Sequence, residues 1–201
     1  MSEDLARSFV AFFVIIDPVG NLVVFNLMTN KMAFAQRMQV AVIAVVAAGT
    51  MLIGFALGGH EMLDFLNISD AAFQVAAGAL LLIPAYRLVT QGQFYESPAE
   101  ATPAPADIAL VPMATPLMAG PGALASATSL SETAGRDDTI PAIVLVLLVS
   151  FAAFVLAERV FGLLGASTMR LLTRLVGIIL VAIAVQFVID GLRASFPGLV
   201  S

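Results

Sequence analysis

Two short segments, Asp17-Pro-Val-Gly-Asn21 and Gly120-Pro-Gly-Ala123, interrupt long apolar stretches of this chain and determine how it folds. The first lies near the middle of residues 5–28, and the second near the middle of residues 108–130. Proline is favoured at the first position of a helix, because the N–H group that it lacks would have no partner there. Each segment therefore predicts that one helix ends and a second half-helix begins within the same apolar stretch.

The apolar stretches are long enough to cross a membrane. Of the 201 residues, 60% are hydrophobic and 11% are charged, whereas soluble domains are about 45–50% apolar and about 25% charged. Continuous apolarity favours helices over the strands of a membrane barrel, whose residues alternate. About 20 apolar residues cross the hydrocarbon core. We predict an all-α integral membrane protein with six transmembrane helices, at residues 5–28, 40–59, 71–89, 108–130, 140–161 and 175–192.

The two interruptions also suggest an internal repeat. Pro18 and Pro121 occupy corresponding places in the two halves of the chain, and so do Gly78 and Gly177, within similar apolar runs. Because each half has three spans, the second half enters the membrane from the opposite side. Discontinuous helices in inverted repeats are common in secondary transporters. We predict two inverted three-helix repeats, residues 1–90 and 108–201, joined by a flexible polar linker at residues 91–107 within one membrane domain.

The charged residues indicate an orientation and exclude some partners. With six spans, the basic residues of one face are Lys31, Arg37, Arg87, Arg159, Arg170 and Arg174, and those of the other are Arg7, Arg136 and Arg193. Because the more basic loops stay in the cytoplasm, we expect a multi-pass protein of the cytoplasmic (inner) membrane with both termini outside. The net charge of −5 argues against nucleic acid as a partner. The chain has no cysteine and one histidine, so we expect no structural zinc site and no cofactor.

The two interruptions differ in charge. The Asp17 carboxylate is able to cap the N–H groups around Gly20 and to leave a negative oxygen facing a cation. No side chain caps the second break, so the N–H groups of Gly122, Ala123 and Leu124 are open to an anion. A small zwitterionic amino acid carries both charges. The candidate substrate-binding residues are Asp17, Gly20, Asn21, Thr115, Gly120, Pro121, Gly122 and Ala123.

Simpler interpretations of these segments stay open. Proline and glycine are tolerated in transmembrane helices as kinks, and Asp17 alone is explained by a structural N-cap. The sequence does not show whether the two breaks face one cavity.

Three motifs resemble the MarC/SnatA family over the whole length of the chain. They are Asp-Pro-x-Gly-Asn within residues 12–21, Ala-Gly-Pro-Gly within residues 116–123, and Gln-Phe-x-x-Asp-Gly within residues 183–192. The resemblance implies a six-span inner-membrane protein that transports small neutral amino acids, with glycine and alanine as substrates, driven by an ion gradient. It also implies that Asp17, Gly20, Asn21, Gly120 and Gly122 form the binding centre.

Other functions compete with transport by alternating access. The chain has no Gly-x4-Gly-Lys-[Ser/Thr] motif for ATP, and coupling to a proton or a sodium ion is open. We expect no enzyme, because the single histidine lies at the outer interface and Asp17 is the only central carboxylate. A channel, a structural membrane protein or an exporter of another small metabolite are the alternatives. The motif Gly54-Phe-Ala-Leu-Gly58 is compatible with a homo-oligomer.

Overall fold

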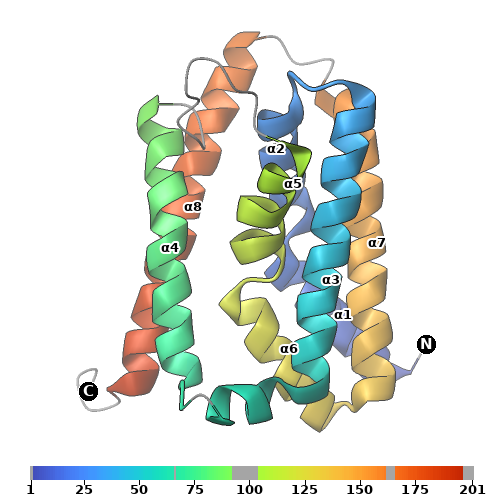
Figure 1. Cartoon of the computed structure of the whole chain (residues 1–201), viewed down its shortest axis with the longest axis vertical. Coiled ribbons are helices and arrows are strands. Elements are labelled where there is room, and N and C mark those ends of the chain that lie inside the picture. Colours follow the sequence, from blue (N-terminus) through green and yellow to red (C-terminus); the bar gives the residue numbers. More distant parts are fainter. Residues whose placement is uncertain (1, 66, 92–103, 162–165, 197–201) are drawn as a thin grey trace.

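The computed structural model describes residues 2–65, 67–91, 104–161 and 166–196, and every regular element in these ranges is helical (Figure 1). This confirms the prediction of an all-α protein. The predicted linker falls mostly on residues 92–103, which lie outside the described residues. The elements are α1 (Glu3–Ile16), α2 (Pro18–Thr29), α3 (Phe34–Phe65), α4 (Asp70–Gln91), α5 (Pro105–Ile108), η1 (Ala109–Met118), α6 (Pro121–Thr133), α7 (Arg136–Phe161) and α8 (Ala166–Ser195).

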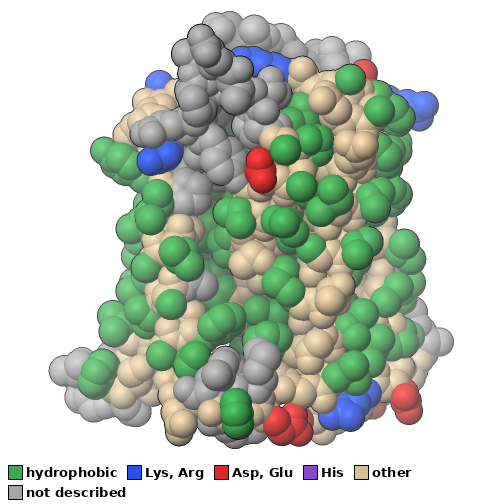
Figure 2. All heavy atoms as spheres, viewed as in Figure 1, with side chains coloured by type: hydrophobic (Ala, Val, Ile, Leu, Met, Phe, Trp, Pro, Cys, Tyr) green, Lys and Arg blue, Asp and Glu red, His purple; other side chains and the backbone are tan. Residues whose placement is uncertain are grey.

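The helices have the lengths and composition of membrane spans. In the described part of the chain, five stretches are long and apolar enough to cross a membrane: Glu3–Thr29, Phe34–Gly59, Ala71–Gln91, Arg136–Arg159 and Gly177–Ser195. A sixth arises if Pro105–Met118 and Pro121–Thr133, which are bent by 57° relative to each other, form one broken span. Figure 2 shows hydrophobic side chains over the middle of one face and charged side chains gathered toward its two ends. This distribution suits a bilayer.

The broken helices lie inside a bundle that α4 and α8 complete on one side (Figure 1). Helix α3 packs against η1 and α6, α7 packs against α1 and α2, and α4 packs mainly against α8. Helix α1 begins and α8 ends at the same end of the bundle, as an even number of spans requires.

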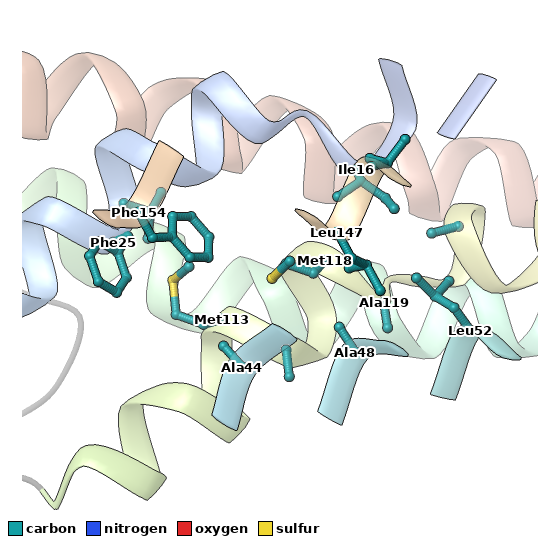
Figure 3. Packing of buried hydrophobic residues seen from close by; sticks show 14 of the residues in the cluster. Ile16, Phe25, Ala44, Ala48, Leu52, Met113, Met118, Ala119, Leu147 and Phe154 are labelled. Atoms are coloured by element: carbon teal, nitrogen blue, oxygen red, sulfur yellow. The ribbon is translucent and has the colours of Figure 1, made fainter. Parts of the chain in front are cut away.

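Small residues on α3 allow the second broken helix to pack closely. The small residues Ala44 and Ala48 lie on one face of α3 with Leu52, and all three are fully buried. They face Met113 and Met118 of η1, which lie between α3 and the first broken helix (Figure 3). Close approach of this kind drives helix association in lipid, where no hydrophobic effect between helices is available.

A buried arginine joins the C-terminal end of α2 to α3 and α7. Arg37 of α3 is 8% exposed and donates a hydrogen bond from Nη2 to Asn26 Oδ1 at 3.2 Å. Its guanidinium lies 5.8 Å from the ring centroid of Phe25 and 3.9 Å from the carboxylate of Glu158 on α7. These contacts join α2, α3 and α7 where a free buried charge would be costly.

Glycines bring α4 and α8 into backbone contact. A methyl group on Gly78 of α4 would lie 2.6 Å from the carbonyl oxygen of Ala184 on α8. A methyl group on Gly177 of α8 would lie 3.0 Å from the backbone nitrogen of Val89 on α4. Each helix therefore supplies a glycine where the backbone of the other comes close.

The mutation Gly78→Ala should destabilise the protein, because the added methyl group forces α4 and α8 apart. Overpacking of this kind costs about 1–3 kcal/mol. The control is Gly54→Ala on α3, where an added methyl group meets no atom within 4 Å. We expect thermal unfolding in detergent, followed by circular dichroism, to give a lower Tm for Gly78→Ala only. Equal Tm values for the two variants would contradict the close contact.

Candidate functional site

Asp17 ends α1 and begins α2. Its backbone is left-handed, with φ 47° and ψ 71°, a conformation that aspartate tolerates better than most residues. Its N–H donates to the carbonyl of Phe13 at 3.1 Å, and its Oδ1 accepts from the N–H of Gly20 at 2.9 Å. Pro18 is the first residue of α2. The predicted N-cap and half-helix at the first break are thus confirmed.

Gly20 and Asn21 complete the break. A methyl group on Gly20 would collide with the Asp17 carboxylate, so this cap requires glycine. In a continuous helix the N–H of Gly20 would bond to the carbonyl of Ile16, but here it bonds to Asp17. Asn21, which is 4% exposed, donates from Nδ2 to that carbonyl at 2.6 Å. The break therefore leaves few backbone groups without partners, as membrane burial demands.

A cavity of about 140 Å³ opens beside the first break. Asp17, Gly20 and Asn21 supply its polar side. The rest of the lining is apolar and comes from α1, α2, α4, η1 and α8, with Leu81, Pro116, Ile183 and Phe187 among its residues.

Among the described residues, no positively charged side chain pairs with the Asp17 carboxylate. It accepts the cap hydrogen bond from Gly20, and it takes part in neither the Arg7–Glu3 nor the Arg37–Glu158 ion pair. Asp17 is exposed and lies near the middle of the stretch Glu3–Thr29. Ionisable side chains at this depth in membrane proteins almost always face the bundle interior or a water-filled cavity.

At the second break, as at the first, a proline begins a new helix, but no acidic side chain caps that helix. Gly120 is extended, with φ −76° and ψ 169°, and no side chain caps α6. The expectation of a free N–H on Leu124 is wrong, because that group donates to the Gly120 carbonyl at 2.9 Å. The N–H groups of Gly122 and Ala123 lie in the first turn of α6, where a helix supplies no acceptor.

The structure does not bring all predicted residues to one surface. Thr115, Gly120, Pro121, Gly122 and Ala123 are absent from the cavity lining. The hydroxyl of Thr115 points to α3, where Oγ1 lies 3.2 Å from the sulfur of Met51.

Phe187 of α8 lies between the cavity and the second break. It lines the cavity, and a methyl group on either Gly120 or Gly122 would lie 3.7 Å from its ring. Phe187 belongs to the Gln-Phe-x-x-Asp-Gly motif, and the sequence predicted no role for it in the site. That motif was the signal available for finding it.

The described residues offer no evident metal centre. Within the described ranges, no group of three or more His, Asp or Glu side chains comes together in a way that could hold a metal ion. The polar chemistry of the cavity is that of one carboxylate, one amide and a helix break.

A bundle of apolar helices, broken around a cavity with a carboxylate, defines a multi-span helical membrane protein. Residues 3–196 match the profile of the MarC family integral membrane proteins. The chain belongs to this family, and the resemblance drawn from the three motifs is confirmed.

Relatives match over almost the whole chain. A UPF0056 membrane protein of Methanocaldococcus jannaschii is 36% identical over 94% of this chain and 95% of its own length. The UPF0056 membrane protein YvbG of Bacillus subtilis is 28% identical over the full length of both chains. The UPF0056 membrane protein YhcE of Escherichia coli is 29% identical over 97% of this chain and 94% of its own length. These names state a membrane protein and no substrate. No solved structure matches the chain.

The mutation Gly20→Ala should damage the first break, because the methyl group displaces the Asp17 carboxylate from the cap. Loss of an N-cap costs about 0.5–2 kcal/mol. The matched variant is Gly122→Ala at the second break, where the methyl group meets Phe187 at 3.7 Å and Ile15 at 3.9 Å, ordinary contacts. We expect Tm in detergent to fall for Gly20→Ala and to stay near that of the unmutated protein for Gly122→Ala. The reverse order would mean that the cap does not depend on Gly20.

Proposed function

We propose that this protein is a secondary active transporter of small neutral amino acids, glycine and alanine among them, in the cytoplasmic membrane. The observation that carries the proposal is the carboxylate of Asp17, which lies midway along a span and lines a cavity without a cationic partner among the described side chains. A substrate ammonium group would supply the missing positive charge. The apolar remainder of the cavity suits a small apolar side chain.

The cavity volume favours small substrates. A dry cavity of about 150 Å³ holds benzene, a molecule of about six non-hydrogen atoms, and the cavity here is about 140 Å³. Glycine and alanine fall within this limit. Leucine exceeds it.

Alternating access between two inverted repeats, residues 1–90 and 108–201, accounts for the arrangement of the helices. In support, Gly78 contacts α8 at Ala184 and Val188, and Gly177 contacts α4 at Leu88 and Val89. These contacts are reciprocal, as an inverted repeat requires. Motion of one repeat against the other would open the cavity to each side in turn, with both chain ends outside.

Uptake of radiolabelled glycine tests this function. The purified protein is placed in proteoliposomes, and a proton or a sodium gradient is imposed, with unlabelled alanine, serine and leucine as competitors. We expect saturable uptake that one gradient stimulates and that alanine blocks. Flux that does not saturate would indicate a channel, and no flux of glycine from folded protein would overturn the proposal.

The mutation Asp17→Asn removes the negative charge of residue 17 and keeps a side chain that is able to cap α2. Asparagine caps a helix as well as aspartate and tolerates the left-handed conformation, so we expect an unchanged Tm. Glycine uptake should fall roughly tenfold or more, because hydrogen bonds to charged groups contribute about 1.5–3 kcal/mol. The control is Glu132→Gln, which removes a charge from an exposed residue of α6 outside the cavity. Full uptake by Asp17→Asn would show that the carboxylate does not bind the substrate or the coupling ion.

A further inference from the structure

The backbone contact between α4 and α8 determines where the Phe187 ring lies. The Cβ atom of Phe187 is 3.0 Å from where a methyl group on Gly78 would be, so α8 comes this close only because residue 78 is glycine. From there the side chain reaches both the cavity and the beginning of α6.

The Phe187 ring lies close to the surroundings of both breaks. On one side lies the cavity with Asp17, Gly20 and Asn21. On the other side lie Gly120 and Gly122, whose added methyl groups would be 3.7 Å from the ring. Ile15 of α1 also lines the cavity and lies 3.9 Å from such a group on Gly122. No residue of 120–123 reaches the cavity while the ring is in this position.

We propose that Phe187 is the specificity-determining residue of this site, because its ring sets the size limit for the substrate side chain and separates the Asp17 pocket from the beginning of α6. This inference rests on the proposed transport function. The Phe187 side chain rotates about single bonds, so a change of rotamer moves the ring without disturbing the backbone. Removing the ring joins the cavity to the space beside Gly120 and Gly122, and larger neutral amino acids then fit.

The first experiment measures substrate range. Glycine uptake is measured with leucine as competitor for the unmutated protein, Phe187→Ala, Phe187→Leu and the control Ile189→Ala, a residue of α8 that does not line the cavity. We expect Phe187→Ala to improve competition by leucine about tenfold or more, since an apolar pocket discriminates by about that factor per methylene group. Phe187→Leu should be intermediate, and Ile189→Ala should behave like the unmutated protein. Exclusion of leucine by Phe187→Ala, in protein that still takes up glycine, would overturn this inference and leave the proposed function standing.

The second experiment tests the partition without relying on transport. The chain has no cysteine, so Gly122→Cys introduces a single thiol. Its reaction rate with a water-soluble methanethiosulfonate reagent is measured alone, with Phe187→Ala, and with Ile183→Ala. Ile183 lines the cavity, so Ile183→Ala enlarges the cavity and leaves the Phe187 ring in place. We expect the reaction to be several-fold faster with Phe187→Ala only. Equal rates in all three proteins would show that the ring is no partition, whether or not the protein transports glycine.

Discussion

The hydrogen bond from the Gly20 N–H to the Asp17 carboxylate is the interaction on which the rest of the site depends. A helix that breaks within a bilayer exposes backbone groups that lipid cannot satisfy. Here one carboxylate oxygen takes the N–H of Gly20, and the Asn21 amide takes the carbonyl of Ile16. The break is thereby stable, and the negative charge of Asp17 stays beside a cavity in mid-span.

The second break reaches a similar shape by different means. Gly120 is extended and carries no capping side chain, and its carbonyl accepts the N–H of Leu124. Negative charge therefore marks the first break, while the positive end of a helix dipole marks the second. Helices α4 and α8 close the cavity beside the first break, and α8 carries Phe187, whose ring lies between that cavity and the second break. Their glycines matter because backbone contact between the helices determines how far the ring reaches.

Local motifs were reliable guides to the broken helices and to the family. Asp17, Pro18 and Gly20 act within four residues of one another, so their spacing in the sequence already specifies the cap. The same reasoning placed Thr115 in the binding site, but its hydroxyl is directed to Met51 of α3, far away in the sequence. A short polar residue near a break does not show by itself which neighbouring helix it will face.

The sequence by itself determined that the chain spans a membrane, which stretches are helical and where two of them break. These properties follow from composition and from contacts between residues close in sequence. Only the tertiary structure decided that Asp17 lines a cavity, that Gly122 does not, and that Phe187 lies between them. The physical reason is that α4 and α8 are apolar on faces toward lipid and toward the cavity alike. Apolar residues such as Leu81 and Phe187 thus carry no local sign of the face they occupy, and helix packing alone assigns it.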